Sequence, residues 1–298
     1  MMGRPRSLPV FLSNSSQRVT LHRDAVLKHG THDQKSHAGS RRRYGPDDES
    51  DGRYRMPKRE DGKKKDEAEP DDDVIRTKDF DEALRLLSEG KRVELDSPAK
   101  AYTLVKRLHE FAQRAKKEGR NAPNLDLCKV SVPGTNLFCG GNLGIERKKM
   151  PQLSGKARKG SAADAMPKSD KGEVNVGKMF TDSLRSSGVE VRETTVPASR
   201  LRASQSQLVG ASVGWMMSSE GQKALGIGTS KQNRIFVSRD GYVIDGHHRW
   251  AANVGLDSSD GSLGDVDMPV TMIDLPISEV LALATEFADE VGILPKEG

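Results

Sequence analysis

The fold of this 298-residue chain is decided at residues 245–250, which read Asp245-Gly246-His247-His248-Arg249-Trp250. Just upstream, an Asp-Gly pair separates two triplets of β-forming residues, and this pattern predicts a hairpin from Ile235 to Ile244. Downstream, the spacing of Trp250, Ala251 and Val254 predicts a helix that packs one apolar face on a sheet. Asp245 has the residue type of a helix N-cap. The stretch is therefore expected where a strand turns into a helix.

Such a turn is suited to binding an anion. The first N–H groups of a helix lack intrahelical partners and lie at the positive end of its dipole, and a glycine lets a ligand approach the backbone closely. His247, His248 and Arg249 add side-chain donors at the same place. Arginine offers a rigid fork for phosphate oxygens, and histidine can donate to phosphate, take up a proton or bind a metal. The pattern predicts a phosphate-handling site, and the alternative is that the histidines only cap and pack.

These residues resemble the ParB/sulfiredoxin superfamily, in which a Gly-x-x-Arg turn at a helix start grips nucleotide phosphates. Residues 245–249 look most like the D-G-H-H-R turn of its free-serine kinase branch, and residues 237–252 look like ParB-like domains encoded by tailed phages. Residues 196–205 resemble the first strand and loop of the same domain. The resemblance covers about residues 190–275. It implies a compact α/β (α+β) fold and a phosphate-gripping role for Gly246, His248 and Arg249, with Gln205 as a further nucleotide-binding side chain.

The departures from the superfamily narrow the expected activity. Sulfiredoxins carry a catalytic cysteine where this chain has His247, so repair of sulfinic acids is not expected. Chromosome-partitioning ParB proteins carry Glu-Arg-Arg after the glycine, whereas this chain has His-His-Arg, so a CTP clamp is not expected. The loop Ser204-Gln205-Ser206 offers no carboxylate base of the kind that the serine kinase needs.

The leading hypothesis is that the turn binds a nucleotide, ATP or CTP, with Mg²⁺ bridging the phosphate oxygens beside Asp245. Phosphoryl transfer or hydrolysis would then use Arg249 and the backbone amides to hold phosphate, and His247 or His248 as general base or transition-state donor. Two alternatives stay open. One is a non-catalytic interaction protein of a virion or packaging machine, and the other is a metal-dependent nuclease with Asp245, His247 and His248 as candidate ligands.

Composition divides the chain into four parts. Only 34% of the residues are hydrophobic and 31% are charged, so part of the chain is expected to have no core. We expect a disordered charged arm over residues 1–73, a small α/β accessory module over 74–155, a flexible linker over 156–175 and the ParB/sulfiredoxin-like domain over 176–298. The linker is rich in Lys, Gly, Ala and Ser.

The arm suggests partners. Its basic clusters and the net charge of +5 are compatible with non-specific DNA binding. Residues 28–39 contain His29, His32 and His37, a weak metal motif that resembles a segment of phage head-associated proteins. Phage head proteins are therefore candidate partners, and the host cytoplasm or a virion is the expected location.

Three further expectations concern single segments. No stretch approaches the roughly 20 apolar residues that span a membrane, so no membrane partner is expected. Cys128 and Cys139 match no zinc or redox motif, and a reduced pair is the default, although a hairpin there would permit a bond. Ser206 is expected to cap a helix that runs through Trp215 and Met217.

Overall fold

The structure, a computed structural model, describes residues 74–120, 125–230 and 232–295 and confirms a mixed α/β fold. The expected arm, with its basic clusters and the histidines of residues 28–39, lies outside the described residues. Within the described part, no helix is both long and apolar enough to cross a membrane.

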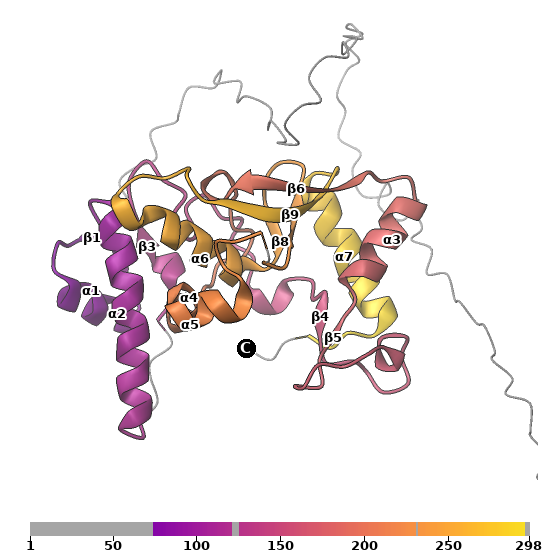
Figure 1. The fold of residues 1–298 in the computed structure, drawn as a ribbon, viewed down its shortest axis with the longest axis horizontal. Helices are drawn as coiled ribbons and strands as arrows, with labels where there is room; N and C mark the ends of the chain where they lie inside the picture. Colours follow the sequence, from indigo (N-terminus) through magenta and orange to yellow (C-terminus); the bar gives the residue numbers. More distant parts are fainter. Residues whose placement is uncertain (1–73, 121–124, 231, 296–298) are drawn as a thin grey trace, which may run out of the picture.

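The largest sheet of the described residues has four strands, and its strands β6 and β9 run along the upper side of the view in Figure 1. Its strand order is β6-β9-β7-β8, with bounds Val191–Pro197, Asp267–Ile273, Ile235–Ser238 and Val243–Asp245. Strand β9 pairs antiparallel with β6 and parallel with β7, and β7 pairs antiparallel with β8. The predicted hairpin is thus confirmed as β7 and β8, joined at Asp240 and Gly241.

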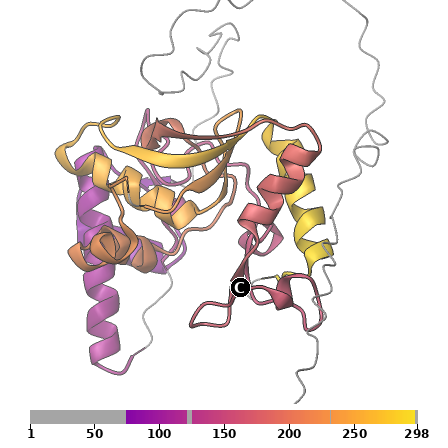
Figure 2. The ribbon, with the colours of Figure 1, turned by 45° about the vertical axis from the view of Figure 1, so that its right-hand side comes forward.

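The sheet separates two apolar cores because alternate strand residues point to opposite faces. Val237, Val243 and Val270 enter one core, which also contains Trp250 of helix α6 (His247–Asp257). Ile244 and Ile273 enter the second core. There α3 (Gly177–Ser186) and α7 (Ile277–Val291) lie side by side, with the ring centroids of Phe180 and Phe287 5.3 Å apart (Figure 2).

The N-terminal described part is a small parallel α/β unit. It comprises β1 (Val74–Arg76), α1 (Phe80–Ser88), β2 (Arg92–Glu94), α2 (Pro98–Lys117) and β3 (Val130–Ser131), with strand order β1-β2-β3. Helix α2 packs on α4 (Gly210–Met217), and the short helix α5 (Ser219–Leu225) follows α4. Buried residues between Ala83 and Cys139 share the first core with the sheet, so this part of the expected accessory module packs directly on the main body.

Residues 156–175 were predicted to be a flexible linker, but they pair in a strand, bury a side chain and hydrogen-bond to another element. Strand β4 (Ser154–Gly155), just before this segment, pairs antiparallel with β5 (Val174–Asn175) at its end. Between them Ala163 is fully buried, and the Arg158 N–H donates to the Gly292 carbonyl at the end of α7. A composition of small and polar residues does not reveal such contacts, because the Gly292 carbonyl lies far away in the sequence, at the end of α7.

Three local expectations are corrected. Helix α6 is capped by Gly246, and Asp245 is the last residue of β8 instead of the cap. Helix α4 begins at Gly210, four residues after Ser206, whose hydroxyl donates to the Ile145 carbonyl. Cys128 and Cys139 form a disulfide instead of a reduced pair.

Candidate functional site

The strand-to-helix turn depends on Gly246. This residue has φ 96°, in the left-handed region that favours glycine, and a Cβ there would lie 2.4 Å from Cγ2 of Ile235. The backbone can therefore reverse tightly between β8 and α6. The glycine N-cap has no side chain, so no cap side chain accepts from the first N–H groups of α6.

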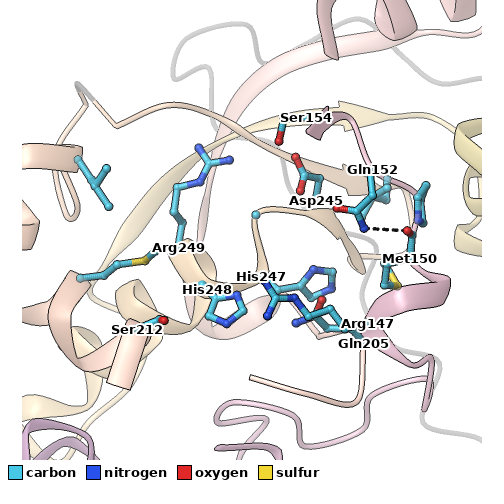
Figure 3. Close-up of a pocket in the computed structure, with 15 residues that line it drawn as sticks. Arg147, Met150, Gln152, Ser154, Gln205, Ser212, Asp245, His247, His248 and Arg249 are labelled. Atoms are coloured by element: carbon cyan, nitrogen blue, oxygen red, sulfur yellow. Dashed lines mark hydrogen bonds between the residues drawn. The ribbon is translucent and has the colours of Figure 1, made fainter. Parts of the chain in front are cut away.

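The start of α6 opens into a pocket of about 400 Å³, a volume typical of small-molecule sites (Figure 3). The turn 245–249 supplies one side of the pocket. The segment 147–154 and helix α4 supply the others, and Gln205 also lines it. The candidate residues of the turn are therefore brought together at one cavity.

His247 is held in the interior by the loop that contains Ser204. Its Nε2 accepts a hydrogen bond from the Ser204 N–H at 3.2 Å and lies 3.0 Å from the Ser204 Oγ. The Ser204 hydroxyl itself donates to the Val243 carbonyl at 2.6 Å. Burial, and next the charge of His248, lower the pKa of His247 from 6.5 to about 3. The ring is therefore neutral at physiological pH. A neutral imidazole that already accepts from an amide is poorly suited to act as a general base.

His248 and Arg249 also contact backbone groups. The Nε2 of His248 accepts from the Val209 N–H at 3.1 Å, directly before α4. Arg249 donates from one guanidinium nitrogen to the Asn233 carbonyl at 2.8 Å. Burial lowers the pKa of Arg249 from its ordinary value, while Asp245 opposes that shift. Both side chains thus combine a packing role with a place on the pocket wall.

The remaining predicted residues, Asp245 and Gln205, both line the pocket. Gln205 is only 4% exposed and its amide nitrogen donates to the Gln207 carbonyl. Within the described residues, Asp245 is the one carboxylate on the pocket wall, and no three His, Cys, Asp or Glu side chains are grouped to hold a metal.

Several pocket residues lie outside the predicted turn. They come from the 3-10 turn Arg147–Lys149 and the segment after it, and from α4 and α5: Arg147, Met150, Pro151, Gln152, Ser154, Ser212, Met216 and Leu225. Arg147 matters most because it brings a second guanidinium group to the pocket.

Comparison with known proteins adds no relative. No protein-family model matches the chain, and neither the curated proteins nor the solved structures contain a match.

Proposed function

We propose that the pocket at the start of α6 binds a nucleotide or a related phosphate ester. The observation that carries the proposal is that the glycine-capped start of α6 opens into a pocket lined by both Arg147 and Arg249. Two guanidinium groups face one carboxylate, Asp245, so the charged side chains of the wall favour an anionic ligand. The likeness of the turn to the Gly-x-x-Arg motif of the ParB/sulfiredoxin superfamily supports the same ligand class.

The pocket wall also fits the rest of a nucleotide. Met150, Pro151, Met216, Leu225 and Ile244 give it apolar surface against which a base and ribose can pack. The phosphates would then lie at the helix start, where backbone N–H groups and guanidinium groups are the donors. ATP and CTP are the candidate ligands.

Mg²⁺ fits the site through Asp245. This ion typically takes one or two protein carboxylates and completes its coordination with phosphate oxygens and water, so a single carboxylate beside the phosphates meets its requirement. When bound, Mg²⁺ would neutralise charge on the phosphate oxygens. Asp245 would hold the ion, and Arg147 and Arg249 would hold the phosphates.

We propose binding as the primary activity and assign His247 a positioning role. Its Nε2 is used by the Ser204 amide, and its lowered pKa leaves it neutral. Any phosphoryl transfer or hydrolysis at this pocket would therefore need a base other than His247, and Asp245 keeps its role as the Mg²⁺ ligand. A histidine that serves only to position the backbone also suits a second function, a non-catalytic interaction protein associated with a virion or with packaging.

Calorimetric titration of the full chain with ATP, ADP and CTP in the presence of Mg²⁺ tests the proposal. The full chain is needed because residues 147–154 form one wall. We expect Arg147→Ala to weaken binding by roughly 10- to 100-fold, since a hydrogen bond to a charged group contributes about 1.5–3 kcal/mol. Arg249→Ala is expected to abolish binding in protein that stays folded by circular dichroism.

Lys148→Ala is the matched control for Arg147→Ala. Lys148 is the next residue of the same 3-10 turn, is paired with Glu146 at 3.0 Å and lies outside the pocket wall. Its removal should leave the affinity unchanged. Equal affinities of the Arg147→Ala variant and the parent chain would refute the phosphate site, and absence of binding to all three nucleotides would favour the non-catalytic alternative.

A further inference from the structure

The loop of residues 204–209 is clamped between the pocket and a disulfide. On the pocket side, His247 holds the Ser204 N–H and His248 holds the Val209 N–H. These two hydrogen bonds place both ends of the loop against the first turn of α6. Gln205, between them, lines the pocket. A shift of this loop would therefore change the pocket wall and the two histidines together.

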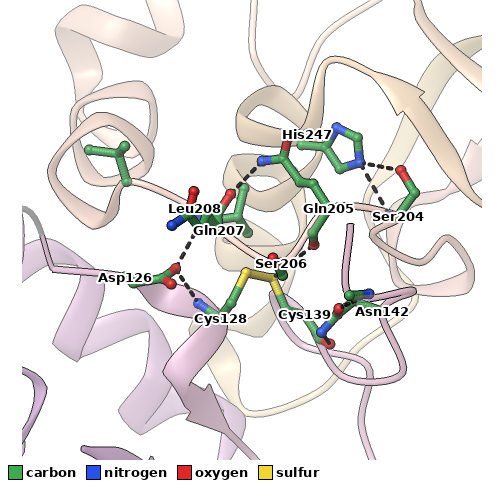
Figure 4. Close-up of a disulfide and its surroundings, with 12 residues drawn as sticks. Asp126, Cys128, Cys139, Asn142, Ser204, Gln205, Ser206, Gln207, Leu208 and His247 are labelled. Atoms are coloured by element: carbon green, nitrogen blue, oxygen red, sulfur yellow. Dashed lines mark hydrogen bonds between the residues drawn. A yellow bond between two sulfur atoms is a disulfide. The ribbon is translucent and has the colours of Figure 1, made fainter. Parts of the chain in front are cut away.

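On the opposite side the loop rests on the segment that carries Cys128 (Figure 4). The Asp126 Oδ1 accepts from the Leu208 N–H at 2.8 Å and from the Cys128 N–H at 3.0 Å. The Leu127 N–H donates to the Leu208 carbonyl at 2.8 Å. Asp126 thus ties the backbone of the loop directly to the backbone of Cys128.

The disulfide joins the segment of Cys128 to Cys139, which contacts the loop at a second point. Cys128 is bonded to Cys139, and the Cys139 sulfur lies 3.9 Å from the Gln205 carbonyl oxygen. One sulfur is therefore two residues from Asp126, and the other contacts the loop itself. The bond fixes the distance between the two supports while the loop lies across them.

The two cysteines differ in exposure. Cys139 is only 4% exposed, whereas Cys128 is half-buried. Cys128 is therefore the residue nearer to solvent, and attack of a thiolate on its sulfur would displace Cys139 as the leaving group.

We propose that the Cys128–Cys139 disulfide is a redox switch that sets the order of loop 204–209 and, through it, ligand binding in the pocket. The effect on a ligand rests on the proposed function, whereas the effect on the loop does not. A dithiol reductant attacks the Cys128 sulfur, and the Cys128–Cys139 bond breaks as a mixed disulfide forms at Cys128. The second thiol of the reductant closes its own disulfide and releases Cys128, so two electrons and two protons end on the two cysteines.

The structure offers a hydrogen-bond acceptor to the thiol that Cys139 would carry after reduction. A Cys139 thiol has the Gln205 carbonyl within reach as an acceptor, so its burial after reduction is tolerated. Cys128 would then no longer be fixed relative to Cys139, and the hydrogen bonds that Asp126 makes to Leu208 and Cys128 would open more often. The loop should loosen at its amides without unfolding of the sheet.

Amide hydrogen exchange on the full chain, before and after reduction with dithiothreitol, tests the switch. Complete reduction is verified by an increase in the intact mass equal to two hydrogen atoms. We expect the amides of Ser204, Leu208 and Val209 to exchange about tenfold faster or more after reduction, because local opening sets their rate. The amides of β9 serve as the internal reference and should not change. A Cys128→Ser variant should exchange like the reduced chain and be insensitive to dithiothreitol.

The outcomes separate this proposal from the proposed function. Unchanged loop exchange in fully reduced protein would overturn the switch, and so would equal acceleration in β9, which would make the disulfide a general staple. In a parallel titration with ATP and Mg²⁺, reduction should weaken binding about tenfold, a change of about 1.4 kcal/mol. If no nucleotide binds in either redox state, the proposed function fails while the exchange data still decide the switch.

Discussion

At the scale of single residues, the turn is organised by side chains that serve the backbone of neighbouring elements. Gly246 has a backbone conformation that residues with a side chain rarely adopt, and it packs against Ile235, where a Cβ would not fit. His247 and His248 then accept from backbone N–H groups at the two ends of loop 204–209, and Arg249 donates to the Asn233 carbonyl. The pocket is therefore rigid where a phosphate is expected to bind, which reduces the ordering cost of binding.

The buried His247 should make the protein sensitive to acid. Its pKa is about 3 in the folded chain, against 6.5 ordinarily, so between these values the unfolded chain takes up a proton that the folded chain does not. Stability should therefore fall as the pH drops from 6.5 to about 3 and stop changing from this cause below that. A pKa gap of this size corresponds to at most about 5 kcal/mol of folding free energy.

Urea unfolding at a series of pH values checks this expectation with the variant His247→Gln. A glutamine carbonyl oxygen can accept from the Ser204 N–H but cannot be protonated in this range, so the variant should lose less stability in acid than the parent chain. His109→Gln, on the half-buried face of α2, is the matched control and should follow the parent. Parallel curves for His247→Gln and the parent would contradict the lowered pKa.

At the scale of elements, α2 and α4 approach so closely that glycine is needed between them. A Cβ at Gly214 would lie 2.6 Å from the Val105 carbonyl oxygen and 2.8 Å from the His109 Cβ, both on α2. Helix α4 thereby comes near enough to α2 to position Ser212 and Met216 in the pocket.

Gly214→Ala should therefore destabilise the protein even though alanine is the better helix former. Helix propensity would gain about 1 kcal/mol, but overpacking against a backbone oxygen costs about 1–3 kcal/mol or more, and the helices must move apart. We expect a net loss of about 1–2 kcal/mol in urea unfolding. Glu110→Ala, on the exposed side of α2, should stay within about 0.5 kcal/mol of the parent. A stabilised Gly214→Ala protein would show that the contact is not tight.

The elements around the candidate site could be predicted from the sequence because their signals are local. The Asp-Gly turn predicts the β7–β8 hairpin, and the spacing of Trp250, Ala251 and Val254 predicts α6. The start of α4 could not be predicted, since the Ser206 hydroxyl donates to the distant Ile145 carbonyl instead of capping a helix. Likewise, no local pattern predicts that the Arg158 N–H donates to the Gly292 carbonyl. The composition of residues 156–175 therefore indicated a linker.

At the scale of the whole molecule, the candidate site is shared between segments far apart in the sequence. The turn 245–249 was predictable because its five residues are contiguous. Arg147 and the segment 150–154 were not, because they lie far from the turn in the sequence and reach the pocket only through tertiary packing. The disulfide lies at the junction between residues of the N-terminal unit and the loop 204–209.

The shared core implies that the C-terminal half does not fold alone. Leu104, Leu108 and Phe138 are buried in the same core as Val213 and Trp250, so removing the N-terminal unit would expose a large apolar surface. A fragment of residues 174–298 should lack a cooperative urea transition and bind a hydrophobic dye, as partly folded chains do. A fragment of residues 74–298 keeps every described core residue and should unfold cooperatively. If the shorter fragment unfolded in one sharp transition with native near-ultraviolet circular dichroism, the two halves would be independent domains, and the pocket would have to be regarded as an interface between them.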